Sequence, residues 1–348
     1  MTQSRALVVF CALAALAAWS SGATAQTATP TVTLRIADSF PSGHVFHQVL
    51  TWPFIQEVEK VSGGKIKFQH FPGEQLGKAK DMLMLAQSGV VDIGSVMPDY
   101  ASDKMPLSAA FELPGAFPDY CQGVRAFWSI SHDSGFLAKN EFEPNKVVPI
   151  ITFMLPTYQI IIGSSKTINS LDDMAGLKVR SAGGAMDFML HDLNMVPLRM
   201  TPPEVYEGLS RGTIDAAVLP YNSAKSYSLI PLLKSGTVGE NFGTVVSAYA
   251  MSEKEWQQLP DSVRSILMDV GHKISIEACT KFVAAEDEAL AEAKEHGVKQ
   301  IKFSAADNKM LNTMFSRAAQ DWASSLDKRG RPGSAALAAV KEAVDESK

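Results

Sequence analysis

The sequence is poor in the features that mark several common classes of protein. Only three of its 348 residues are cysteines, and its lysines and arginines form no cluster. Acidic residues outnumber basic ones by 37 to 32, which gives a mild formal net charge of −5. One apolar run stands out, Ala6 to Trp19, and it is too short to cross a membrane. These absences argue against a disulfide-framed scaffold, a transmembrane protein and a nucleic-acid-binding protein.

The apolar run belongs to a predicted export signal over residues 1–25. Arg5 supplies its positive charge, and Ala23-Thr24-Ala25 forms an A-x-A cleavage site after the run. Cys11 lies within the run behind the bulky Phe10, where a lipoprotein signal needs a small residue. We therefore expect Cys11 to be removed with the signal, and the mature protein to be exported to the periplasm.

Two cysteines remain in the mature chain, Cys121 and Cys279, far apart in sequence. An oxidising compartment would permit a disulfide between them, but one pair in a protein of this size is not a framework. We expect two buried free thiols.

Helical and strand periodicities alternate along the mature chain, which is long enough for two lobes with separate cores. Strands are expected over residues 33–37, 65–71, 92–96, 147–153, 160–163, 176–181, 195–200, 213–220, 244–251 and 299–303. Helices are expected over residues 44–62, 118–137, 185–193, 260–297, 308–326 and 334–344, with two shorter ones ending at Ser88 and Gly212. Trp322 is expected in the core, and the glutamate-rich residues 286–295 on a solvated helix face.

Two stretches of the chain repeat one order of elements. The strand over residues 65–71, a proline and a helix lead into the run Gly89-Val90-Val91-Asp92-Ile93-Gly94. The strand over residues 195–200 and a proline-led helix capped by Thr201 lead into Gly212-Thr213-Ile214-Asp215. Two copies of this order predict two lobes of similar topology.

Arg180 is the leading candidate for a ligand-binding residue. It stands near the carboxyl end of the predicted strand Gly176-Leu177-Lys178-Val179-Arg180-Ser181, just before a glycine-rich loop. Ligands bind at that edge of open α/β sheets, and a guanidinium matches a carboxylate with two parallel N–H donors. A surface ion pair is the commoner fate of an arginine, but the position at a strand end favours the ligand.

Three runs together resemble a known family. They are residues 176–180, the segment from Glu204-Val205-Tyr206 to Asp215, and the segment from Gln75-Leu76-Gly77 to Asp92. The order of these runs is similar to that in solute-binding proteins of TRAP transporters, the tripartite ATP-independent periplasmic systems, in their large dicarboxylate-type receptor family. The resemblance covers nearly the whole mature chain.

The resemblance implies a fold and a partner. The fold is α/β and periplasmic-binding-protein-like, with two α/β lobes, crossing strands and a long helix that spans both. Lobe I would comprise residues 26–156 and 246–285, and lobe II residues 157–245 and 286–348, including both C-terminal helices. A ligand would bind in the cleft between the lobes, and the closed receptor would dock on membrane permease subunits driven by an ion gradient. We expect a monomer that binds no nucleic acid.

The cleft is expected to be lined by side chains at strand ends, in the loops that follow them and in the first crossing between the lobes. These side chains are Arg180, Gln159, Tyr158, Phe40, His44, Met97, Tyr100, Leu219 and Asn222. The resemblance places Met97 and Tyr100 toward the ligand, and the alternative for Tyr100 is a core position.

Two positions depart from the family pattern. A second arginine often stands where this chain has Gln159 or Ile160, and an asparagine often stands where it has Leu219. A buried carboxylate without a partner costs several kcal/mol, whereas an apolar ligand body gains about 25 cal/mol per Å² buried. We therefore predict a monocarboxylate with an apolar or aromatic body.

His44 and His47 form an H-x-x-H pair at helical spacing, which can in principle bind a metal. No third ligand is near them in the sequence, and the H-E-x-x-H motif is absent. We expect no metal and no cofactor, with His44 as a hydrogen-bonding residue of the cleft.

Three functions stay open on the sequence. The first is a receptor whose lobes close over a carboxylate. The second is an exported enzyme in the same cleft, although the chain has no G-x-S-x-G elbow, dinucleotide fingerprint, P-loop or zinc-protease motif. The third is a protein that presents its ligand to a sensor kinase. We favour the receptor and expect no enzymatic activity.

Overall fold

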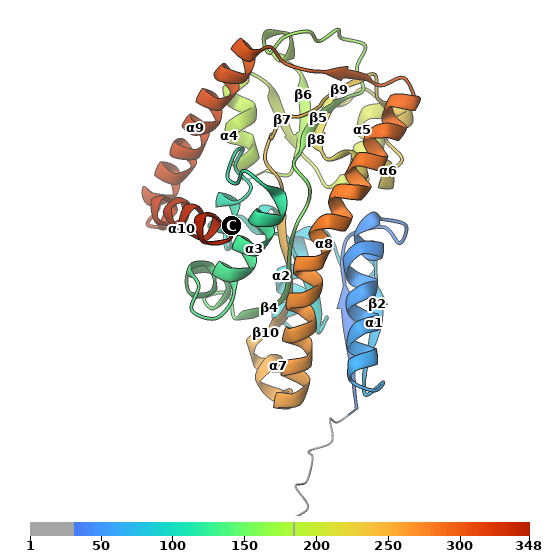
Figure 1. The fold of residues 1–348 in the computed structure, drawn as a ribbon, viewed down its shortest axis with the longest axis vertical. Coiled ribbons are helices and arrows are strands. Elements are labelled where there is room, and N and C mark those ends of the chain that lie inside the picture. The colour runs from blue at the N-terminus through green and yellow to red at the C-terminus, as the bar shows by residue number, and fades with distance from the viewer. Residues whose placement is uncertain (1–30, 184) are drawn as a thin grey trace, which may run out of the picture.

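The computed structural model describes residues 31–183 and 185–348. It has two β-sheets, one above the other in Figure 1, with helices packed around both. The predicted export signal over residues 1–25, with Arg5 and Cys11, lies outside the described residues. Within the described part, no helix combines the length and apolar character needed to span a bilayer.

The lower sheet in Figure 1 has five strands in the order β2-β1-β3-β10-β4. They are β1 (Val32–Ala37), β2 (Ile66–Phe71), β3 (Ile93–Val96), β4 (Val147–Met154) and β10 (Val246–Ser252). β1 pairs in parallel with β2 and β3, whereas β10 runs antiparallel to β3 and β4. We call the part of the molecule built on this sheet lobe I.

The upper sheet has six strands in the order β11-β9-β5-β8-β6-β7. They are β5 (Gln159–Ile162), β6 (Lys178–Ser181), β7 (Val196–Arg199), β8 (Ala216–Leu219), β9 (Ser235–Thr237) and β11 (Lys299–Ile301). β6 pairs in parallel with β7 and β8, and β5 is antiparallel to β8 and β9. This part is lobe II, and the expected two-lobed α/β fold is confirmed.

Ten α-helices complete the described chain. They are α1 (Trp52–Val61), α2 (Met82–Gln87), α3 (Tyr120–Ser131), α4 (Ala185–Asp192), α5 (Val205–Ser210), α6 (Tyr221–Ser226), α7 (Glu253–Gln258), α8 (Asp261–Glu295), α9 (Ala305–Asp327) and α10 (Gly333–Glu346). The turn before α5 begins at Thr201, the cap expected from the sequence, whose N–H and Oγ1 both donate to the Glu204 carboxylate at 2.7 Å. The helix expected from about residue 44 is helical from residue 45 and includes a π-helical turn over His47–Thr51 that leads into α1.

Helix α8 and two chain crossings join the lobes. Figure 1 shows α8 running alongside both sheets, and an ideal Cβ on Gly271 would approach the Ile150 carbonyl of β4 within 2.0 Å. The crossings that link β4 to β5 and β9 to β10 are bonded to each other, because Tyr158 N–H donates to the Gly243 carbonyl at 2.7 Å. The expected spanning helix and crossing strands are both present.

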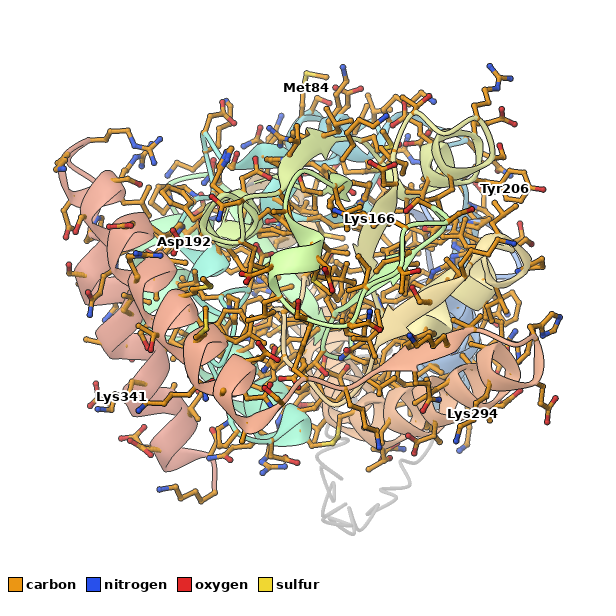
Figure 2. The ribbon with its side chains drawn as sticks, turned by 90° about the horizontal axis from the view of Figure 1, so that it is seen from above. Met84, Lys166, Asp192, Tyr206, Lys294 and Lys341 are labelled. Carbon is orange, nitrogen blue, oxygen red and sulfur yellow. A yellow bond between two sulfur atoms is a disulfide. The ribbon has the colours of Figure 1, made fainter. Side chains whose placement is uncertain are left out.

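The buried apolar core is continuous across the lobes. One apolar cluster includes Phe54 and Ile36 of lobe I together with Ile160 and Leu190 of lobe II. Figure 2 shows the labelled side chains of Lys294 on α8 and Lys341 on α10 toward the outside of the molecule. The apolar core therefore extends from one lobe into the other, and hydrogen bonds between the lobes show that the cleft is closed in this structure.

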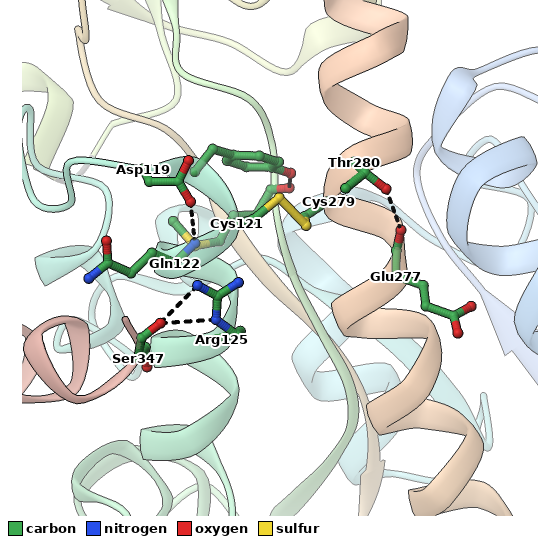
Figure 3. Close-up of a disulfide and its surroundings, with 10 residues drawn as sticks. Asp119, Cys121, Gln122, Arg125, Glu277, Cys279, Thr280 and Ser347 are labelled. Carbon is green, nitrogen blue, oxygen red and sulfur yellow. Dashed lines mark hydrogen bonds between the residues drawn. A yellow bond between two sulfur atoms is a disulfide. The ribbon is translucent and has the colours of Figure 1, made fainter.

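Cys121 and Cys279 form a disulfide, so the expectation of two free thiols is wrong. Figure 3 shows the bond joining α3 to α8. The two Cα atoms lie 5.3 Å apart, although 158 positions separate the residues in sequence. The fold brings α3 against α8, a contact that no local pattern reveals.

The C-terminal helices divide between the lobes. α9 begins beside lobe II, where Arg317 pairs with Asp192 of α4 at 3.0 Å. α10 lies beside α3 of lobe I, and Val340 and Trp322 share an apolar cluster with Phe127 of α3. This packing differs from the expectation that both helices close lobe II. Trp322 is a core residue, as predicted.

Candidate functional site

The carboxyl ends of strands from both lobes meet at the closed interface. Three hydrogen bonds cross from one lobe to the other there. Arg180 Nη2 donates to the Tyr100 hydroxyl at 2.9 Å, and Val45 N–H donates to Ser226 Oγ at 3.2 Å. Arg199 Nη2 donates to the backbone carbonyl of Asp99. These contacts define the candidate site as the interlobe cleft.

Arg180 is held firmly at the centre of this interface. Its side chain is 1% exposed, which is rare for an arginine without an acidic partner. Nε donates to the Met200 carbonyl at 3.0 Å, and Nη1 donates to the Val218 carbonyl at 3.3 Å. A guanidinium has five N–H donors. With three used here, one N–H on Nη1 and one on Nη2 remain, the pair that matches a carboxylate end-on.

A pair of buried acids lies near the arginines, and the sequence analysis did not select it. Asp99 is 2% exposed and Glu112 is 4% exposed. Burial raises the pKa of Asp99, with Arg180 and Arg199 opposing that rise. Burial and the neighbouring Asp99 carboxylate raise the pKa of Glu112 well above its usual range. Within the described residues, both carboxylate oxygens of Asp99 and Oε2 of Glu112 have no hydrogen-bond partner.

Two tyrosines present hydroxyls near Arg180. Burial raises the pKa of Tyr100, whose hydroxyl accepts from Arg180. Burial also raises the pKa of Tyr158 well above its usual range, and the nearby Arg180 charge opposes the rise. Both phenols therefore stay neutral. Tyr158 is 2% exposed, and Tyr100 bonds directly to Arg180.

Apolar and aromatic side chains of lobe I lie beside these polar groups. Phe40 stacks on Phe46 with ring centroids 4.3 Å apart and packs against His44 at 4.8 Å. Met97 is buried in the core cluster shared by both lobes. Phe40, His44 and Met97 all follow the carboxyl ends of β1 or β3, as the sequence predicted.

His44 is fully buried with one ring nitrogen unsatisfied. The backbone N–H of Phe46 donates to His44 Nδ1 at 3.1 Å, so the proton of the neutral ring is on Nε2. Within the described residues, Nε2 has no hydrogen-bond partner. Burial lowers the pKa of His44 to about 3, which keeps the ring neutral. His44 thus presents one unused N–H donor.

Asn222 also presents an unused donor. Its Oδ1 accepts from Ser223 Oγ at 3.3 Å, while Nδ2 is buried with no partner among the described residues. The backbone N–H groups of Tyr221 and Asn222 donate to the Glu286 carboxylate at 2.8 Å each. Glu286 therefore fixes the start of α6 from α8, and the expectation of a wholly solvated glutamate face there is wrong.

Gln159 and Leu219 offer no free polar group to the cleft. Gln159 Nε2 donates to the Glu240 carbonyl at 2.6 Å, and its Oε1 accepts from Thr237 Oγ1 at 2.8 Å. It borders a separate cavity of about 340 Å³ beside the chain crossings. Leu219 packs in the apolar cluster of lobe II that includes Val205. The sequence analysis predicted Gln159 and Leu219 as cleft residues from their positions relative to the family pattern, which does not reveal these hydrogen-bond partners.

A cavity of about 570 Å³ opens at the edge of the interface. It is lined by Tyr100, Glu74 and Lys78 from lobe I and by Arg199, Met200 and Thr201 from lobe II, among others. A second cavity, of about 360 Å³, shares Glu74 and Pro203 with it and reaches Tyr227. The closed interface therefore retains openings on the side where Tyr100 lies.

The two histidines of the H-x-x-H pair point to different partners. His47 joins Asp38 and His70, and one ligand atom from each of these three residues lies within 4.8 Å of the others. The expectation that no third group is near His47 is wrong, because β2 brings His70 beside the loop after β1.

Hydrogen bonds already occupy Asp38. It accepts from His47 Nε2 at 3.0 Å, His70 Nε2 at 2.8 Å, Tyr249 Oη at 2.8 Å and Phe40 N at 2.9 Å. Burial opposes ionisation of Asp38, but the bonds from both histidines lower its pKa to about 2. A cation would have to replace these bonds. As it stands, the network fixes the loop that carries Phe40 and His44.

Comparisons with known proteins agree with this architecture. Residues 36–325 match the protein family described as bacterial extracellular solute-binding protein, family 7. The chain belongs to this family, that of the TRAP solute-binding proteins. A solute-binding protein of Albidiferax ferrireducens is 27% identical over 260 residues, which cover 72% of this chain and 75% of that protein.

Solved structures of TRAP solute-binding proteins share the fold. One from Rhodoferax ferrireducens, with copurified benzoate, has a TM-score of 0.84 at 24% identity, covering 91% of this chain and 98% of its own. One from a marine metagenome, with 3-hydroxybenzoate, has a TM-score of 0.85 at 23% identity, covering 92% and 100%. The recognised family and the two-lobed fold are confirmed.

Proposed function

We propose that this TRAP solute-binding protein is an extracytoplasmic receptor that binds a small monocarboxylate in the interlobe cleft. Arg180 carries the proposal, because it is fully buried at the interface with two N–H donors left over. Burying a guanidinium is costly unless its donors are satisfied. A ligand carboxylate bound end-on would accept from both remaining N–H groups of Arg180. It would lie at the interface, where side chains of both lobes can contact it.

The charges near Arg180 favour one carboxylate over two. Arg180 and Arg199 are the cations close to Asp99, and Arg199 is already bonded to the Asp99 carbonyl. The Asp99 and Glu112 pair and Asp187 supply negative charge nearby. A second ligand carboxylate placed beside these acids would cost several kcal/mol unless it met a cation of its own. Gln159 and Leu219 add no positive charge.

The ligand body is proposed to be apolar or aromatic. Phe40, Met97 and Tyr158 are buried beside the polar groups, and each contributes carbon surface. Two of the similar structures hold aromatic monocarboxylates, which is in line with this lining. We further propose that the receptor releases its ligand unchanged to membrane permease subunits after export to the periplasm. The disulfide between α3 and α8 suits such an oxidising compartment.

A binding screen tests the proposal. The mature chain, residues 26–348, is mixed with aromatic monocarboxylates, 2-oxo and hydroxy acids, sugar acids and aliphatic dicarboxylates, and its melting temperature is measured. A ligand of the native state stabilises it by RT ln(1 + [L]/Kd), so a specific acid raises the midpoint. Monocarboxylate hits support the proposal, a dicarboxylate that binds tightest overturns the ligand class, and no hit overturns the receptor.

Matched variants then test whether Arg180 binds the ligand carboxylate. Arg180→Lys keeps the charge but loses the planar fork, so the dissociation constant should rise by about tenfold or more. Lys178→Gln is the control, because Lys178 is exposed on the same strand and its side chain donates to the Gly212 carbonyl, away from Arg180. Equal affinity in wild type and Arg180→Lys would remove Arg180 from the site. Chromatography of the bound acid after long incubation shows whether it is released unchanged.

A further inference from the structure

Two buried side-chain donors near the interlobe interface have no hydrogen-bond acceptor within the described residues. His44 is 0% exposed and Asn222 is 2% exposed, and within the described residues neither His44 Nε2 nor Asn222 Nδ2 has a partner. An unmade hydrogen bond from a buried donor is unfavourable, so native proteins rarely leave one. Two such donors in one region therefore point to a group that arrives with the ligand.

Both donors belong to the contact between the loop after β1 and helix α6. The His44 ring packs on Tyr227, with centroids 5.0 Å apart. Val45 N–H donates to Ser226 Oγ, and Ser226 Oγ in turn donates to the Asn222 carbonyl at 2.9 Å. His44 thus comes from lobe I and Asn222 from lobe II, on two segments that contact each other across the interface.

This region adjoins the Arg180 site. Burial raises the pKa of Tyr227 well above its usual range, and the charge of Arg180 is close enough to oppose the rise. Tyr227 thus packs on the His44 ring and lies within range of the Arg180 charge. In the proposal that follows, a ligand whose carboxylate is held by Arg180 extends toward the two donors.

We propose that His44 Nε2–H and Asn222 Nδ2–H form a second polar subsite, which receives a hydroxyl or carbonyl oxygen on the ligand away from its carboxylate. The inference rests on the proposed function and narrows it to oxygen-substituted monocarboxylates. Both groups are donors only, because Nδ1 of His44 and Oδ1 of Asn222 are already engaged. The subsite therefore accepts an oxygen and disfavours an ammonium or a methyl group.

Paired acids test the subsite by isothermal titration calorimetry. The pairs are 3-hydroxybenzoate with 3-methylbenzoate, 4-hydroxybenzoate with 4-methylbenzoate, and 4-oxopentanoate with 4-methylpentanoate. In a purely apolar pocket the methyl member would bind about fourfold tighter, since a buried methyl gains about 0.8 kcal/mol. With the two donors in place, the oxygenated member of at least one pair should bind wild type tenfold tighter or better.

Variants separate the subsite from general damage to the protein. His44→Phe and Asn222→Leu each remove a donor and keep an apolar body, so each should reduce that preference to about threefold or less, while the methylated acid binds at least as well. His191→Phe and Asn140→Leu are exposed controls and should keep the preference. If one cleft variant does not fold, the other and the wild-type ratio decide.

The outcomes distinguish this inference from the proposed function. If no acid binds wild type, the receptor function fails. If acids bind but wild type prefers the methylated member of every pair, the subsite is overturned while the receptor stands. The subsite is overturned as well if the oxygen preference survives unchanged in both cleft variants.

Discussion

Arg180 of lobe II donates a hydrogen bond to the hydroxyl of Tyr100 of lobe I, at 2.9 Å. The same guanidinium is bonded to backbone carbonyls of its own lobe, so its position is set before the lobes meet. Tyr100 follows β3, and its hydroxyl reaches Arg180 only when the lobes are closed. One bond therefore couples the candidate carboxylate-binding group to closure, and a ligand that contacts both residues would favour the closed form.

Tyr100→Phe should weaken ligand binding without abolishing it. The variant loses a hydrogen bond to a charged group, which is worth about 1.5 kcal/mol or more, so the dissociation constant should rise roughly tenfold. Calorimetry with the tightest acid from the screen measures it. Tyr206→Phe is the control, because Tyr206 is 43% exposed on α5. Identical affinities in wild type and Tyr100→Phe would mean that this bond does not contribute to the liganded state.

Loss of the disulfide should destabilise the protein. The bond closes a long loop, with 158 positions between Cys121 and Cys279, so it restricts the unfolded chain. The double variant Cys121→Ser with Cys279→Ser should lose about 2–5 kcal/mol of unfolding free energy.

Reductant provides the control for the disulfide prediction. Dithiothreitol should lower the urea midpoint of wild type toward that of the double variant and leave the variant unchanged. A wild-type midpoint that is insensitive to reductant, together with two titratable thiols, would contradict the pairing.

The protein should be most stable at mildly acidic pH. Burial raises the pKa of Glu141 and of Glu286 from 4.5 to about 7 each. Between pH 4.5 and about 7 the folded state keeps these two carboxyls protonated, whereas the unfolded chain has released the protons. The unfolding free energy therefore falls as pH rises from 4.5 to about 7. The slope is about 1.4 kcal/mol per pH unit for each such group.

The opposite sign holds for Asp38. Its pKa is lowered from 3.8 to about 2, so its contribution is present above 3.8 and is lost as pH falls toward 2. His44 acts with the same sign as Asp38, because its pKa is lowered from 6.5 to about 3, and it reduces the fall in unfolding free energy that the two glutamates cause between pH 4.5 and 6.5. Together these shifts place the maximum at about pH 4–5. Urea unfolding from pH 3 to 8 measures the curve, and Glu286→Gln should flatten its alkaline side. Stability that rises steadily from pH 5 to 8 would show that these carboxyls are ionised in the fold.

Gly271→Ala should separate α8 from β4. An added Cβ would approach the Ile150 carbonyl carbon within 3.1 Å and its oxygen within 2.0 Å. Because both atoms belong to backbone, neither can move aside as a side chain would, and we expect a loss of about 2–4 kcal/mol. Gly43→Ala is the control, since nothing lies within 4 Å of its added Cβ. Equal melting temperatures for both variants would contradict this close approach.

The sequence by itself determined the elements and the place of the candidate site. Alternating periodicities and turn residues predicted the strands of both sheets, because these patterns depend only on residues close together along the chain. Arg180 followed from its place at a strand end, and the structure confirms that place, while its ligand role stays a prediction. Phe40, His44, Met97 and Tyr100 followed from the same rule, since carboxyl ends of parallel strands share one edge.

Tertiary structure alone decided which side chains meet. Asp99 stood in a recognised turn, but Glu112 showed no local signal, and only the fold brings them together. The fold likewise pairs Cys121 with Cys279, turns Glu286 onto α6 and directs Gln159 away to Thr237. Apart from Asp99 and Glu112, which are 13 positions apart in the sequence, these contacts join residues separated by 65 positions or more. They depend on how the helices pack and how the lobes close, which local patterns along a chain do not encode.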